Sequence, residues 1–96
     1  MKIECEVRPT EDKEKLKKML SAVFKGVKFK EEQGKITGEI SEKDFLSLCE
    51  EKQTLIIPQM LEENKEVKLS KLALFAGKLV PDEDFPLGAV VVKKEN

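Results

Sequence analysis

The chain has 96 residues, of which 40% are hydrophobic and 39% are charged, and its formal net charge is −1. This length and hydrophobic content indicate one folded domain, residues 1–96, and exclude an intrinsically disordered chain. The charge balance excludes a general electrostatic attraction to nucleic acid. The charged residues are mostly lysine and glutamate, which fits either a heat-adapted protein or a well-solvated small domain.

The first two predicted elements are a strand and a helix. Residues 2–8 alternate between apolar and polar side chains, which predicts a half-buried strand. Pro9 ends the strand, and Thr10 is the predicted N-cap of the helix. Apolar residues then recur at helical spacing over residues 16–23, and Gly26 is placed to end the helix.

A hairpin and two further helices follow. The hairpin is predicted for residues 27–40, with its turn at Gly34 and a bulge or close approach at Gly38. Ser41 begins a capping-box pattern ahead of a short second helix. The third helix is predicted for residues 54–64. The residues expected to face the core from these two helices are Phe45, Leu48, Cys49, Leu55, Ile56, Met60 and Leu61.

The last third of the chain predicts three strands. Residues 67–69 alternate again, and residues 70–71 resemble a tight turn or kink. Residues 72–80 form a nearly continuous apolar run that is typical of a central strand, and residues 89–93 predict the last strand. The order is therefore β-α-β-β-α-α-β-β-β. It indicates an α+β two-layer sandwich, with a mostly antiparallel sheet and helices packed on one face.

Several chemistries are excluded by missing residue types. The chain has no histidine, which removes the usual acid–base group and metal ligand. Cys5 and Cys49 cannot form a zinc site by themselves, and both lie on apolar faces, so we expect buried thiols rather than a disulfide. No glycine-rich phosphate loop is present, and Gly77 is expected to permit close backbone packing. We therefore predict no catalytic residue, metal or cofactor, and hence no enzyme.

An acidic loop at residues 82–84 lies between Pro81 and Pro86. Its carboxylates could bind a hard cation, but the spacing of a dedicated calcium loop is missing. We favour a solvated hairpin tip whose charge discourages edge pairing.

The first helix is the main basic segment, and two interpretations stay open for it. Its lysines could form a solvated face opposite the core stripe, which we favour, or a nucleic-acid surface. The five phenylalanines fall on apolar positions, so a base-stacking platform is not expected. The lysines concerned are Lys13, Lys15, Lys17, Lys18 and Lys25, followed by Lys28 and Lys30 on the hairpin.

The N-terminus lacks an apolar segment of signal-peptide length, and no run approaches the ~20 apolar residues of a membrane span. We expect a cytoplasmic protein with no membrane partner.

Four short segments resemble, in order, the motifs of one family of small archaeal proteins. Residues 69–79, LSKLALFAGKL, are similar to its LNKQAAFxGKV stretch, and residues 85–89, FPLGA, stand where the family has SPLG. Residues 8–12, RPTED, resemble its PTED helix start. Residues 48–55, LCEEKQTL, resemble its LREQKIL helix junction.

That family is described as archaeal RNA-binding proteins of otherwise unknown function, and some relatives are labelled predicted exosome subunits. Its fold is similar to that of the large-subunit ribosomal protein that binds 5S rRNA. This chain departs from the pattern because it is shorter and Arg8 is its only arginine. Ser70 and Leu72 replace the Asn and Gln that flank Lys71.

The resemblance implies a non-enzymatic RNA-binding domain, with Arg8, Lys71 and Lys78 as the candidate contacts. Since lysines contact phosphates as point charges, such binding should be weak, sequence-tolerant and salt-sensitive. The second hypothesis is a protein-interaction module that forms a homodimer through an exposed strand edge.

Overall fold

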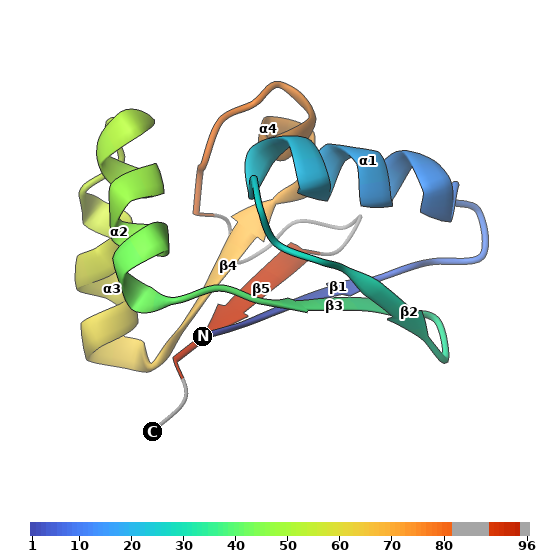
Figure 1. Cartoon of the computed structure of the whole chain (residues 1–96), viewed down its shortest axis with the longest axis horizontal. Helices are drawn as coiled ribbons and strands as arrows, with labels where there is room; N and C mark the ends of the chain where they lie inside the picture. The colour runs from blue at the N-terminus through green and yellow to red at the C-terminus, as the bar shows by residue number, and fades with distance from the viewer. Residues whose placement is uncertain (82–88, 95–96) are drawn as a thin grey trace.

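The computed structural model describes residues 1–81 and 89–94. One antiparallel sheet carries helices against one face, so the α+β prediction is confirmed (Figure 1). The strand order within the sheet is β2-β3-β1-β5-β4. The elements are β1 (Lys2–Glu6), α1 (Lys13–Val23), β2 (Lys30–Glu32), β3 (Lys35–Glu39), α2 (Glu42–Glu51), α3 (Ile56–Asn64), β4 (Glu66–Ser70), α4 (Lys71–Phe75) and β5 (Ala89–Lys93).

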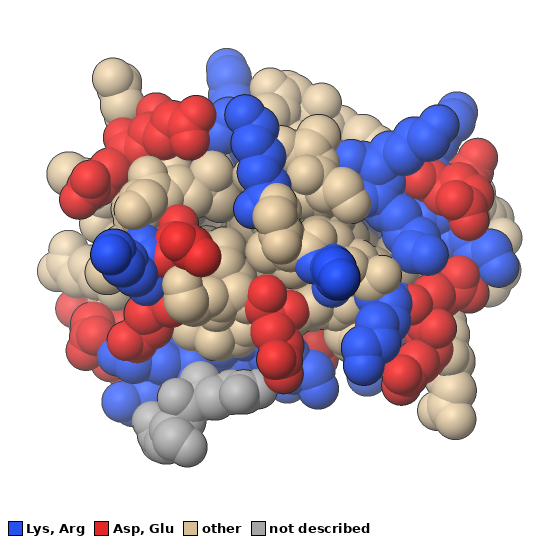
Figure 2. All heavy atoms as spheres, in the orientation of Figure 1, with Lys and Arg blue, Asp and Glu red and all other residues tan. Residues whose placement is uncertain are grey.

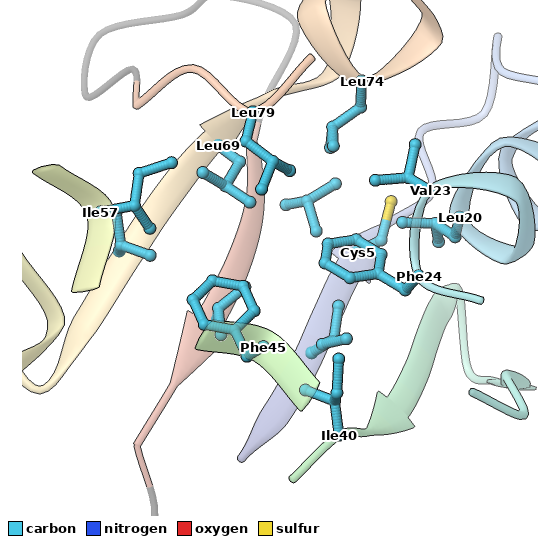
Figure 3. Close-up of a cluster of buried hydrophobic side chains, with 14 of the residues drawn as sticks. Cys5, Leu20, Val23, Phe24, Ile40, Phe45, Ile57, Leu69, Leu74 and Leu79 are labelled. Carbon is cyan, nitrogen blue, oxygen red and sulfur yellow. The ribbon is translucent and has the colours of Figure 1, made fainter. Parts of the chain in front are cut away.

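The core lies between the helices and the sheet face that carries the alternating apolar residues. Ile3 pairs with Gly38 on one side and with Val92 on the other, and all three are buried. Side chains from the helices meet this face, with Phe24 and Phe45 among the largest that are fully buried (Figure 3). The opposite face of the sheet carries mostly charged residues, as the alternation predicts.

Helix α1 begins later than predicted. Asp12, not Thr10, is its N-cap, and the Asp12 carboxylate accepts hydrogen bonds from the backbone N–H groups of Glu14 at 2.9 Å and Lys15 at 3.4 Å. A carboxylate both accepts these bonds and favours the positive end of the helix dipole. Gly26 lies just beyond the helix with φ +83°, a conformation that favours glycine.

The hairpin prediction is confirmed, with strands shorter than predicted on the β2 side. Gln33 and Gly34 both have positive φ, as a two-residue turn of this kind requires. Gly38 is a point of close approach, because a Cβ built there would lie 2.7 Å from Cδ1 of Phe29 and 2.9 Å from Cγ1 of Val27.

Ser41 is confirmed as the N-cap of α2, since its hydroxyl accepts from the Asp44 N–H at 3.1 Å. The predicted core face of the third helix is partly wrong. Leu55 and Ile56 are 67% and 59% exposed, whereas Ile57 and Leu61 are buried. The apolar residues there extend around more than one helix face, so spacing alone does not select the buried pair.

The predicted strand over residues 72–80 is also wrong. Its first part is helix α4, because the Ser70 hydroxyl caps the Ala73 N–H at 3.3 Å and starts a helical turn. Pro81, just beyond the predicted strand, forms an isolated bridge with Leu69 of β4. The predicted acidic loop at 82–84 and the residues after it, up to 88, lie outside the described residues.

In the described parts of the chain, no helix has both the length and the apolar character needed to cross a bilayer.

Candidate nucleic-acid interface

The three residues predicted to contact RNA occupy different environments. Arg8 and Lys78 are exposed, whereas Lys71 is only 3% exposed. The Lys71 ammonium donates to the Glu6 carbonyl oxygen at 2.8 Å and to Oε1 of Glu11 at 2.9 Å. Because Lys71 is buried and its ammonium already donates to two residues, the geometry favours a structural role for it.

Glu11 joins two of these residues. Its Oε1 accepts from the Arg8 backbone N–H at 3.0 Å as well as from Lys71. Burial by itself raises the pKa of Glu11, but the hydrogen bonds from Lys71 and Arg8 outweigh burial and hold the pKa below its usual 4.5. The Lys71–Glu11 pair therefore links the start of α4 to the connection between β1 and α1.

Helix α4 is short but has defined ends. After Phe75, the Gly77 N–H donates to the Leu74 carbonyl at 2.9 Å, and the Lys78 N–H donates to the Ala73 carbonyl at 2.8 Å. These two bonds, with Gly77 at φ +76°, form a Schellman motif. Nothing lies within 4 Å of a Cβ built on Gly77, so its expected role in close packing is wrong and its role is the helix cap.

A groove of about 370 Å³ lies where α1, α4 and the end of α2 meet, and we call it the lysine groove. Its rim carries Lys15 and Lys18 of α1 and Lys52 at the C-cap of α2. Its apolar lining includes Phe75, which is 53% exposed. The described residues that line it include no carboxylate.

The three rim lysines make no ion pair with another described residue, a property that they share with most lysines of this domain. Among the described residues, ion pairs engage Lys2, Lys13, Lys71, Lys93 and Lys94, but not the three rim lysines. In Figure 2, basic side chains lie beside uncharged surface in the upper middle of the view. The rim charges are therefore available to an anionic partner.

The groove continues along α1 toward the middle of α2. A second hollow of about 250 Å³ shares Ala22, Val23 and Lys52 with it. Asp44 and Glu51 line this second hollow. Lys25 and Lys52 line the second hollow too, so its charges balance, whereas the end near α4 has lysines without a carboxylate.

A third hollow, of about 240 Å³, lies between α2 and α3 and is mainly apolar. Lys94 is at its edge, with its ammonium 2.6 Å from Oε1 of Glu62 and 3.2 Å from Oε1 of Glu42. Two carboxylates already neutralise this lysine, so this hollow offers no anion site. No cluster of metal-ligating side chains occurs within residues 1–81 and 89–94.

No family model and no curated protein sequence matches this chain. Several solved structures do match this chain. A protein of the UPF0201 type from Methanococcus jannaschii is 26% identical with a TM-score of 0.73, over 98% of this chain and 80% of that one. A DUF54 protein from Archaeoglobus fulgidus is 16% identical with a TM-score of 0.72, over 94% of this chain and 79% of that one. Another uncharacterised UPF0201 protein is 20% identical with a TM-score of 0.70, over 99% of this chain and 82% of that one.

These likenesses support the resemblance to uncharacterised archaeal proteins that the sequence motifs suggested. The three solved proteins share the fold over 94% to 99% of this chain. The elements that form the lysine groove therefore belong to the shared fold rather than to an added segment.

Sequence reasoning found part of this groove and missed the rest. Lys15 and Lys18 belong to the lysine-rich helix that was one candidate surface. The sequence does not indicate Phe75, because residues 72–80 fit a strand pattern. It does not indicate Lys52, because Lys52 is distant in sequence from Lys15 and Lys18. The available signal was Ser70 as an N-cap, with Leu72 and Phe75 three residues apart on one exposed helical face.

Proposed function

We propose that this chain is a non-enzymatic RNA-binding domain whose lysine groove contacts the phosphate backbone. The observation that carries the proposal is the groove's rim of three lysines, unpaired within the described residues, around a lining without a carboxylate. A local concentration of positive charge can bind a polyanion even when the net charge of the domain is near zero. The motif resemblance to a family described as RNA-binding points the same way.

Among the predicted contacts, Lys78 fits this site best. It is exposed and follows Gly77, which lines the groove. Arg8 is exposed beside the Lys71–Glu11 pair, and it stays a proposed peripheral contact. Lys71 contributes by holding α4, and thus Phe75, in place rather than by touching RNA.

The homodimer hypothesis receives less support from the sheet edges. Strand β2 is three residues long, and all three are charged and exposed. On the other edge, the Ser70 N–H of β4 already donates to the Val80 carbonyl at 2.9 Å. Short, charged or covered edges oppose pairing between sheets of two copies.

The test is fluorescence anisotropy of a labelled RNA titrated with the purified protein at low salt. A triple variant, Lys15→Ala with Lys18→Ala and Lys52→Ala, is expected to lose most of its affinity. The matched control is Lys30→Ala with Lys35→Ala and Lys68→Ala, which removes the same charge from exposed positions outside the groove. Equal losses in both variants would contradict the groove, and no binding by the wild type would contradict the function. Light scattering on the same samples reports any dimer.

A further inference from the structure

Phe75 is an exposed aromatic ring in a domain that has few aromatic residues. It is 53% exposed at the end of α4, whereas Phe24 and Phe45 are fully buried. The Schellman motif at Gly77 fixes the end of the helix, and the Lys71–Glu11 pair fixes its start. The backbone of α4 is therefore fixed at both ends, which places Phe75 at the groove.

The ring and the rim lysines belong to one groove. Lys15 and Lys18 of α1 and Lys52 of α2 line the same hollow as Phe75. A flat apolar ring among ammonium groups matches the two parts of a nucleotide, since a base can stack on the ring while its phosphates meet the lysines. Every nucleotide of an RNA strand joins a phosphate to a planar base, whereas an acidic peptide offers that combination only where an aromatic residue lies beside a carboxylate.

We infer that the lysine groove takes single-stranded RNA, with one unpaired base stacked on Phe75 and the neighbouring phosphates on Lys15, Lys18 and Lys52. This inference rests on the proposed function and adds the substrate class. In a duplex the bases are stacked on one another, so a duplex would meet the lysines but leave the ring unused. Beyond the groove, Asp44 and Glu51 line the second hollow together with Lys25 and Lys52, so its balanced charge attracts phosphates less than the lysine groove does.

A single substitution makes the inference directly observable. The chain has no tryptophan and no tyrosine, so Phe75→Trp introduces its one strong intrinsic fluorophore at the proposed stacking position. The ring is largely exposed, and the variant is expected to fold as the wild type does. The control is Leu46→Trp, because Leu46 is 46% exposed on α2 and lines the hollow between α2 and α3 instead.

The titrants are a labelled oligouridine, the same backbone without bases, and a blunt RNA duplex. Anisotropy of the label reports binding, and protein fluorescence reports stacking. We expect oligouridine to quench the Phe75→Trp variant but not the Leu46→Trp variant, and the duplex and abasic strand to quench neither. Phe75→Ala is expected to weaken oligouridine binding on the order of tenfold and to leave duplex binding unchanged.

The outcomes separate the two proposals. If no RNA raises the anisotropy, the RNA-binding function itself fails. If oligouridine binds but leaves the Phe75→Trp fluorescence unchanged, or if Phe75→Ala weakens duplex and single strand equally, the stacking inference is overturned while the function stands.

Discussion

The ammonium of Lys71 lies 2.9 Å from Oε1 of Glu11, and this pair joins the start of α4 to the connection between β1 and α1. The two residues are 60 positions apart in sequence. The lysine side chain is 3% exposed and the glutamate side chain 23% exposed. Lys71, which the sequence predicts to contact phosphate, is therefore buried and stabilises the fold. Its substitution should lower the free energy of unfolding.

Lys71→Met keeps most of the apolar stem and removes the ammonium. It removes the ammonium donor from the Glu6 carbonyl oxygen and from the Glu11 carboxylate, which keeps only the Arg8 backbone N–H, so we expect a loss of about 2 kcal/mol in the free energy of unfolding. Guanidinium unfolding measures this change. The control is Lys68→Met on β4, an exposed lysine, which should change stability by less than about 0.5 kcal/mol. Equal effects would mean that the buried contacts contribute nothing.

The same pair gives the stability a defined pH dependence. The pKa of Glu11 is lower in the folded protein than its usual 4.5, so its contribution is fully present above that value and is lost as the pH falls through the folded pKa. Glu11→Gln should therefore unfold at a lower temperature than wild type at neutral pH. The gap should shrink below pH 4.5. A gap that stays constant from neutral to acidic pH would show that ionised Glu11 is not stabilising.

Gly38 of β3 is packed closely against Val27 and Phe29, which lie in the connection between α1 and β2. An added Cβ would lie 2.7 Å from Cδ1 of Phe29, so Gly38→Ala must displace this ring or the strand, at a cost of about 1–3 kcal/mol. Phe29→Ala removes both atoms of the closest contacts, Cδ1 and Cε1, so Gly38→Ala combined with Phe29→Ala should cost less than the sum of the two single changes. Thermal unfolding of the two single variants and the double variant tests this, and a double variant that loses as much as the sum of the single changes, or more, would count against it.

Both thiols should be unreactive in the native protein. Cys5 and Cys49 are fully buried, and burial raises the pKa of each to about 11, so the thiolate is scarce at neutral pH. A chromogenic disulfide reagent at pH 8 should label neither until guanidinium unfolds the chain, when both should react. Rapid labelling of the native protein would indicate that the sheet opens near Cys5 or that α2 opens near Cys49.

The elements that the sequence predicts well are those whose pattern depends on local chemistry. Strict alternation around Ile3 and Cys5 defines β1, and Ser41 with Asp44 defines the start of α2. These signals act within a few residues, so no distant contact can overrule them easily.

The failures arise where distant contacts decide. The apolar run after Ser70 fits a strand or a helix, and a Ser70 cap together with Lys71 reaching Glu11 selects the helix. The exposure of Ile56 beside buried Ile57 likewise depends on which face meets the sheet. The lysine groove combines Lys18, Lys52 and Phe75 from three elements, and no local pattern joins them.

The salt dependence of RNA affinity tests the central claim most directly. For a single strand, the slope of log affinity against log salt changes by about 0.7 for each phosphate contact. If Lys15, Lys18 and Lys52 each hold a phosphate, replacing all three with alanine should make the slope shallower by about 2, whereas the Lys30, Lys35 and Lys68 control should keep the wild-type slope. A slope that is unchanged in the groove variant, or shallower to the same extent in both, would contradict RNA binding through this groove.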